Sequence, residues 1–179
     1  MNTELIKLFE KVNKRFLREQ KDFILSGVSE RSICGQLMLY LYLEKSNTTL
    51  SSYYVDIEYN RNEGGKLKTI KNSEEKVLNV TCDIILHSRG LNEQQDNLIA
   101  IEMKKSNQPN KDKDNDRERL MALTKDPDDN IYSYDGKVLP ENVCGYILGI
   151  FYEVNINRKY VNIEYYQKGK FLKGYKLNF

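Results

Sequence analysis

Apolar residues recur every three to four positions in two stretches near the start of the chain, and this spacing predicts helices. The first predicted helix spans Thr3–Leu25. The second begins at Ser29, a residue suited to capping a helix N-terminus, and runs to Leu43 or Glu44. Glu30 falls in the first turn of the second helix and, by helical spacing, at the head of its apolar face.

From residue 53 onward the pattern changes to alternating residues or short continuous apolar runs, which predict strands. The charged stretch Asp112–Lys125 keeps helical spacing, and a small hairpin is predicted at Ile131–Leu139. The predicted strands are Tyr53–Tyr59, Val80–His87, Asn97–Lys104, Val143–Val154, Tyr160–Gln167 and Phe171–Leu177. The order α-α-β-β-β-α-β-β, followed by the short last strand, predicts a single α/β domain built on a mixed sheet.

The composition is that of a globular protein and argues against several classes of site. The 179 residues include three scattered cysteines and one histidine, and the formal charge is +2. One histidine is too few for a His-rich metal cage and disfavours a serine or cysteine triad, while the cysteine spacing suits neither a disulfide framework nor a zinc site. We find no run long enough to span a membrane and no signal peptide, so we expect a cytoplasmic protein without a membrane partner.

Two carboxylates and a lysine lie within predicted apolar strands, where charged groups are costly unless something uses them. Asp83 lies in "VTCDIILH", and Glu102 and Lys104 lie in "LIAIEMKK". If these strands pair as an antiparallel hairpin, the three side chains can come together on one face. Two converging carboxylates repel each other unless a divalent cation such as Mg²⁺ neutralises them. The pattern therefore predicts metal-assisted hydrolysis of a phosphodiester, with Lys104 orienting the attacking water or helping to deprotonate it.

The segment "CDIILH…LIAIEMKKS" resembles the signature of the PD-(D/E)XK nuclease superfamily, the restriction-endonuclease-like fold: an aspartate, then E-x-K in the next strand of a hairpin. The predicted order α-β-β-β-α-β over 29–154 is similar to the core of that fold. "VDIEYNR" and "DRERLMALT" are similar to segments of small uncharacterised bacterial members. Cys82 stands where the family name has a proline. The resemblance implies a three-layer core at 29–154, an N-terminal helical extension at 1–27 and additional C-terminal strands at 155–179.

By this resemblance, Asp83 and Glu102 hold Mg²⁺ or Mn²⁺, and the carbonyl of Met103 is a third ligand. Lys104 positions the attacking water or stabilises the transition state. Glu30 takes the place of an acidic residue that many members supply from the first core helix, and it reaches the metal directly or through water as a supporting catalytic residue. The resemblance implies a metal-dependent nuclease whose partner is nucleic acid, most simply DNA, and it allows a homodimer because many members work as dimers.

The same residues also have simpler interpretations. Glu102 and Lys104 could form an ion pair at the end of a strand, and Glu30 could serve only the helix dipole. Asp116 and Arg119, three residues apart on a predicted helix, are expected to form an ion pair with each other.

Three further side chains are candidate nucleic-acid contacts. Arg61 and Lys66 could bind phosphates, and His87, at the end of the strand that carries Asp83, could border the substrate. Each of them also fits an ordinary surface or structural role.

Two functional hypotheses of different classes follow. The first is a Mg²⁺- or Mn²⁺-dependent phosphodiesterase that cleaves DNA. The second is a catalytically silent, nuclease-like module that binds nucleic acid or another partner. The complete set of Asp83, Glu102 and Lys104 favours the first, and RNA processing stays open because nothing in the sequence reads a 2′-hydroxyl group.

Overall fold

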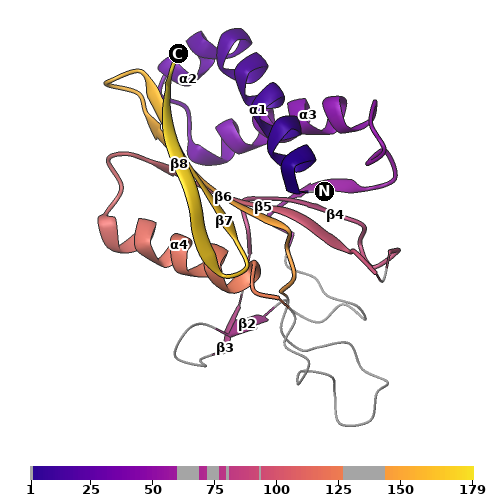
Figure 1. Ribbon diagram of the computed structural model, residues 1–179. Helices are drawn as coiled ribbons and strands as arrows, with labels where there is room; N and C mark the ends of the chain where they lie inside the picture. Colours follow the sequence, from indigo (N-terminus) through magenta and orange to yellow (C-terminus); the bar gives the residue numbers. More distant parts are fainter. Residues whose placement is uncertain (1, 60–68, 72–76, 80, 93, 127–143) are drawn as a thin grey trace.

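The computed structural model describes residues 2–59, 69–71, 77–79, 81–92, 94–126 and 144–179. In this part of the chain, helices cover both faces of a six-stranded mixed sheet with the strand order β1-β4-β5-β6-β7-β8 (Figure 1). The elements are α1 (Asn2–Glu19), α2 (Lys21–Leu25), α3 (Glu30–Lys45), β1 (Tyr54–Ile57), β2 (Thr69–Lys71), β3 (Val77–Asn79), β4 (Ile84–His87), β5 (Asn97–Lys105), α4 (Asn110–Leu123), β6 (Leu148–Asn155), β7 (Tyr160–Gln167) and β8 (Lys170–Asn178). The predicted α/β class with a mixed sheet is confirmed.

The centre of the sheet combines an antiparallel and a parallel pair. β5 runs antiparallel to β4 on one side and parallel to β6 on the other. A parallel pair needs a crossover connection, and α4 lies in the crossover from β5 to β6. Helix α4 therefore covers one face of the sheet at β5 and β6.

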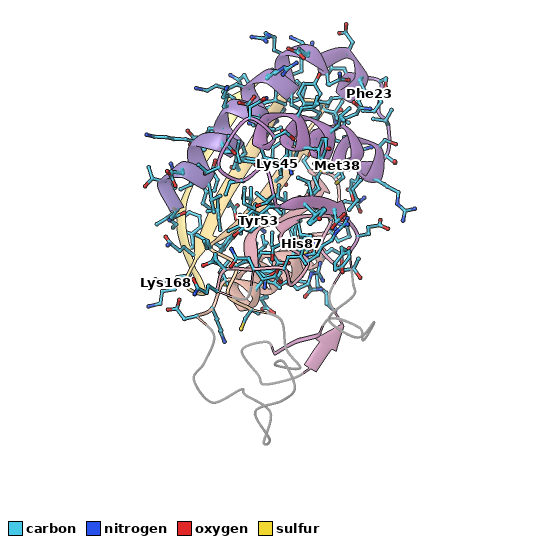
Figure 2. The ribbon with its side chains drawn as sticks, turned by 90° about the vertical axis from the view of Figure 1, so that its right-hand side faces the viewer. Phe23, Met38, Lys45, Tyr53, His87 and Lys168 are labelled. Carbon is cyan, nitrogen blue, oxygen red and sulfur yellow. The ribbon has the colours of Figure 1, made fainter. Side chains whose placement is uncertain are left out.

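Alternation along the strands sorts the apolar side chains into two layers. Ile84, Ile99 and Ile101 belong to the larger core cluster, which includes residues of α1 and α3. Ile85 and Ala100 belong to the smaller cluster beneath α4. Because side chains alternate, Glu102 and Lys104 share the α4 face with Ala100. Figure 2 labels Met38 and Lys45 on α3 in the opposite layer, with Lys168 lower in the view, between β7 and β8.

The first predicted helix is interrupted at Gln20, which separates α1 from α2. Gln20 leaves helical geometry with φ −110° and ψ 16°, and its side-chain amide donates to the Tyr40 hydroxyl at 2.9 Å. The bond ties the break to α3, so a tertiary contact ends a helix that apolar spacing alone would continue.

Several strand boundaries differ from the sequence prediction. β7 matches its predicted range Tyr160–Gln167, and β5 extends one residue further than predicted, to Lys105. β4 begins at Ile84 instead of residue 80, and β6 begins at Leu148 instead of residue 143. The antiparallel pair β2–β3 was not predicted, and the predicted hairpin at 131–139 lies outside the described residues.

The helices of the described part of the chain are too short or too polar to cross a membrane.

Candidate functional site

Asp83 lies immediately before β4 in a bend, so the prediction that it sits inside this strand is wrong. It is nevertheless held at both its backbone and its side chain. Its carbonyl accepts a hydrogen bond from the Glu58 amide at 3.2 Å, and its carboxylate oxygen Oδ2 accepts one from the Met103 amide at 2.7 Å. The side chain thus takes over a bond that a strand backbone would otherwise make, which explains why regular pairing begins one residue later.

The strand register brings Asp83 level with Glu102. Ile84 lies opposite Ile101 in the antiparallel pair, so one further step along both segments places Asp83 opposite Glu102. Directly opposite residues of an antiparallel pair have Cβ atoms about 4.5–5.5 Å apart and point to one face. The predicted convergence of these two carboxylates is therefore consistent with the observed register.

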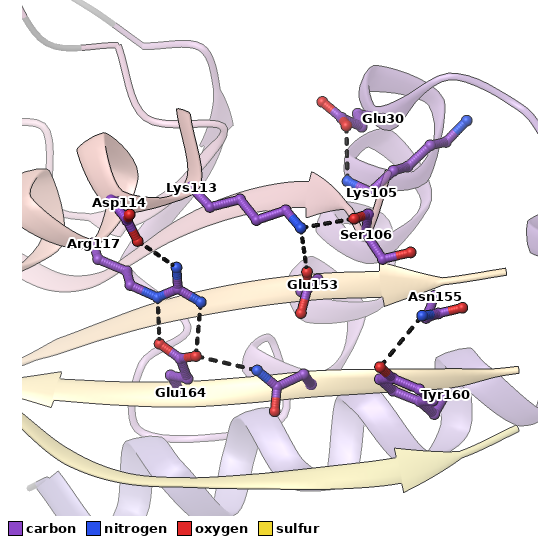
Figure 3. Close-up of polar contacts among 11 residues, drawn as sticks. Glu30, Lys105, Ser106, Lys113, Asp114, Arg117, Glu153, Asn155, Tyr160 and Glu164 are labelled. Atoms are coloured by element: carbon purple, nitrogen blue, oxygen red, sulfur yellow. Dashed lines mark hydrogen bonds and ion pairs between the residues drawn. The ribbon is translucent and has the colours of Figure 1, made fainter. Parts of the chain in front are cut away.

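Glu30 reaches the same end of β5 from α3. Ser29 caps this helix by accepting from the Ser32 amide at 3.1 Å, which sets Glu30 in the first turn. The Glu30 carboxylate accepts a hydrogen bond from the Lys105 amide at 2.8 Å (Figure 3). Two carboxylates from different elements therefore bind alternate backbone amides, those of Met103 and Lys105, where β5 continues beyond β4.

This stretch of β5 has an open side that faces Asp83 and Glu30. The amide and carbonyl of one strand residue point to the same side of the strand. Because the Met103 amide points toward Asp83, the Met103 carbonyl faces the same opening. The backbone geometry is thus compatible with the carbonyl as a third oxygen ligand.

Helix α4 contributes two charged side chains that contact Glu102 and Lys104. Arg119 donates from Nε to Glu102 Oε1 at 2.9 Å and also pairs with Asp116. Lys104 Nζ lies 3.0 Å from Asp116 Oδ2, although this contact lacks hydrogen-bond geometry. The predicted ion pair between Asp116 and Arg119 is confirmed. Its contacts with the strand could not be read from a spacing of three residues on one helix.

Glu102 is a carboxylate in an unfavourable place for its negative charge. Its side chain is 2 % exposed. Burial, with added repulsion from Asp83 and Asp116, raises the pKa of Glu102 to about 8, although Arg119 opposes the shift. Burial also raises the pKa of Asp83, where Asp116 and Glu30 add repulsion while the Met103 amide and Lys104 oppose it. Because burial and neighbouring carboxylates disfavour the charged forms of Glu102 and Asp83, a further positive charge beside them would be favourable.

Lys104 carries a proton in this arrangement. Burial by itself lowers the pKa of Lys104, but the nearby carboxylates, Asp116 first, hold it above its ordinary value. A protonated lysine can donate a hydrogen bond and stabilise negative charge, but it has no lone pair with which to accept a proton. Of the two roles predicted for Lys104, this state fits orientation of water and not its deprotonation.

The donor set fits a hard divalent cation in its chemistry. Asp83 and Glu102 offer carboxylate oxygens, and the Met103 carbonyl is a neutral oxygen ligand of the kind that Mg²⁺ and Mn²⁺ accept. Among the described residues, no group of three or more His, Cys, Asp or Glu side chains is arranged to hold a metal ion. A cation at this site therefore needs water molecules or backbone oxygens to complete its coordination.

The candidate nucleic-acid contacts receive no support. Arg61 and Lys66 lie outside the described residues. His87 is 1 % exposed, and its Nε2 lies 2.8 Å from Asp56 Oδ2, with Arg89 bound to the same carboxylate at 2.8 Å. A buried, paired histidine offers no surface to a nucleic acid in this structure.

Sequence reasoning also missed a set of ion pairs that holds the first half of α4 on the sheet (Figure 3). Lys113 contacts Glu153 on β6 at 2.7 Å, and Arg117 binds both carboxylate oxygens of Glu164 on β7 at 2.9 and 3.0 Å. The buried apolar residues of this helix lie in its second half, at Leu120, Ala122 and Leu123. The N-terminal half of α4 is therefore held on the sheet mainly by ion pairs. The sequence alone suggested that this charged run is solvated.

No family model, curated protein or solved structure matches the chain.

Proposed function

We propose that the chain is a metal-dependent phosphodiesterase that hydrolyses nucleic acid, most simply DNA, at the site formed by Asp83, Glu102 and Lys104. The observation that carries the proposal is the shared position of Asp83 and Glu102 at the open end of β5, with Lys104 on the same strand face. This arrangement of an aspartate, a glutamate and a lysine also supports a restriction-endonuclease-like identity for the fold.

In this proposal Asp83, Glu102 and the Met103 carbonyl hold Mg²⁺ or Mn²⁺. The bound cation supplies charge for the phosphate oxygens and lowers the pKa of a ligand water. Lys104, kept protonated, donates to the attacking water or to a phosphate oxygen. Glu30 holds the Lys105 amide and thereby fixes the course of β5 next to the ligands.

A second candidate function is a silent module that binds a partner without cleavage. One observation favours it: Lys104 and Glu102 are already paired with Asp116 and Arg119. A chain whose reactive groups only neutralise one another would need no metal. The two functions differ in whether a divalent cation binds at Asp83.

The test is a cleavage assay with plasmid, linear and single-stranded DNA and with RNA, in Mg²⁺, Mn²⁺ or EDTA. The wild type is compared with Glu102→Gln and Lys104→Ala, and with Arg117→Gln as a control on the same surface. Metal-dependent cleavage that both site variants lose and the control retains supports the proposal. Cleavage that both site variants retain contradicts the assignment of the site, and binding without cleavage by the wild type supports the second candidate.

A further inference from the structure

Arg119 binds one of the two carboxylate oxygens of Glu102. Its Nε donates to Glu102 Oε1 at 2.9 Å, and its terminal nitrogen pairs with Asp116 on the same helix. The side chains of Glu102 and Asp116 are 2 % and 3 % exposed, whereas that of Arg119 is 27 % exposed. The guanidinium therefore covers two buried carboxylates and reaches the surface itself.

A divalent cation on Glu102 would lie against this guanidinium. Two positive groups beside one carboxylate repel each other, and the repulsion is strong where water is excluded. Arg119 has a second anchor, because Asp116 can retain it when the bond to Glu102 breaks. Loss of the Glu102 bond thus needs a rotation of the side chain and no unfolding of α4.

Arg117 provides a contrast on the same helix. It makes a two-bond contact with Glu164, a further bond to Asp114 at 3.0 Å, and packs on the Phe151 ring at 4.3 Å. Within the described part of the chain, these contacts of Arg117 involve neither Glu102 nor Asp116, so a cation at the site leaves its partners in place. The two arginines therefore form a matched pair, with one bound to the candidate site and one bound away from it.

We propose that Arg119 substitutes for the metal in the metal-free chain, where it neutralises Glu102, and that it binds phosphate once the metal is present. A divalent cation displaces the guanidinium from Glu102. Asp116 then keeps Arg119 beside the cation, where it binds a substrate phosphate. The planar fork of a guanidinium matches phosphate oxygens in pairs, which a lysine does not. The inference rests on the proposed function, because it assumes a cation at Asp83 and Glu102. Asp116 acts as a positioning residue for both Lys104 and Arg119.

The first test measures Mn²⁺ binding directly, by calorimetry or by the loss of the free-ion paramagnetic signal. The chains compared are the wild type, Arg119→Gln, Arg117→Gln and Asp83→Asn, each first checked for a cooperative thermal transition. Removing a competing unit charge at contact distance should tighten Mn²⁺ binding by about tenfold or more in Arg119→Gln. Arg117→Gln should match the wild type, and Asp83→Asn should lose binding.

The outcomes distinguish a failure of the proposed role of Arg119 from a failure of the proposed metal site. If the wild type binds Mn²⁺, Asp83→Asn does not, and Arg119→Gln binds no more tightly than the wild type, the substitute role of Arg119 is refuted while the metal site stands. If neither the wild type nor Arg119→Gln binds Mn²⁺, the metal site and the inference are both refuted.

A second test uses the wild-type chain and so does not depend on how a variant folds. The Nε–H resonance of ¹⁵N-labelled Arg119, assigned with Arg119→Lys, should shift on Mg²⁺ addition because its bond to Glu102 is lost. A short DNA duplex with phosphorothioate linkages should then shift it again, while the Arg117 resonance stays in place through both steps. An Arg119 resonance unmoved by Mg²⁺ contradicts the displacement, and one unmoved by the duplex contradicts the phosphate contact.

Discussion

The Asp83 carboxylate accepts a hydrogen bond from the backbone amide of Met103 at 2.7 Å, and this contact fixes the aspartate at the end of β5. The bond uses one carboxylate oxygen, Oδ2, and leaves Oδ1 for another partner. A structural side chain and a metal ligand could both make this contact. The distinction lies in charge, because the hydrogen bond needs only an acceptor whereas a cation needs a carboxylate.

The first prediction uses this distinction. Asp83→Asn should keep the bond from Met103, through its amide oxygen, and should fold like the wild type, but it should lose stabilisation by Mg²⁺. A ligand at one hundred times its dissociation constant stabilises a fold by about 2.7 kcal/mol. Thermal unfolding in Mg²⁺ and in EDTA measures this gain for both chains. An equal gain in wild type and variant would place the cation elsewhere.

The second prediction concerns Glu30, which binds the Lys105 amide at 2.8 Å. Glu30→Ala leaves that amide without its partner and should lower the free energy of unfolding by about 1–2 kcal/mol. Glu30→Gln retains an acceptor and should unfold near the wild type, yet bind Mn²⁺ several-fold more weakly because one nearby charge is lost. Urea unfolding and Mn²⁺ titration are measured on both variants.

Asp112→Asn is the matched control for Glu30, since Asp112 is an exposed acid in the first turn of α4. It should leave both measurements unchanged. If Glu30→Gln binds Mn²⁺ as tightly as the wild type, Glu30 serves β5 and the helix end but not the cation.

The third prediction is a loss of stability in acid through Glu164. Burial alone would raise the pKa of Glu164, but bonds from Arg117, Tyr166 and Asn162 hold it below its ordinary value. A lowered pKa stabilises the fold above the unfolded value of about 4.3, and this contribution is lost as pH falls through the folded value. Glu164→Gln should therefore be less stable than wild type at pH 7, and the difference should shrink toward pH 3.

Urea unfolding at the two pH values measures this difference, and Asp114→Asn serves as its control. Asp114 also binds Arg117, but its side chain is 67 % exposed, so its ion pair contributes little. If Glu164→Gln and wild type differ by the same amount at pH 7 and pH 3, the Arg117 contact does not govern acid stability.

The fourth prediction concerns the attachment of α1 to the sheet. The Tyr152 hydroxyl donates to Asn13 Oδ1 at 2.7 Å inside the core, and the Asn13 amide nitrogen has no hydrogen-bond partner in the described part of the chain. Tyr152→Phe would leave both polar atoms of the Asn13 side chain unpaired, so it should cost about 1–3 kcal/mol of unfolding free energy. Asn13→Leu combined with Tyr152→Phe should recover part of this loss, as thermal unfolding would show.

The sequence predicts the helices and strands of this molecule best where a single hydrophobic periodicity determines the element and no distant contact alters it. β7 lies at its predicted range because seven of its residues pair with strands on both sides, although its register with β8 shifts between Tyr165 and Tyr166. The first helix was not predicted to break, because the break at Gln20 depends on Tyr40, twenty residues away. The position of Asp83 outside β4 depends in the same way on the Met103 amide.

The candidate site also combines contacts that the sequence could predict with contacts that it could not. Convergence of Asp83 and Glu102 follows from pairing two strands in order, which the sequence allows one to anticipate. The contacts from Arg119 to Glu102 and from Asp116 to Lys104 do not, because they depend on where the crossover helix passes over the sheet. A charge pattern on one helix specifies its local ion pair and says nothing about the strand beneath it.

The continuation of β5 beyond β4 has a consequence for association between chains. A strand with free amides and carbonyls along one side is a template for an added strand, and natural sheets protect such edges with charged groups. Here Asp83 and Glu30 occupy the Met103 and Lys105 amides, so the carboxylates that favour a cation also block intermolecular strand addition. Truncating both side chains to alanine would free these amides as well as remove charge from the site, and solubility would then fall together with cation affinity.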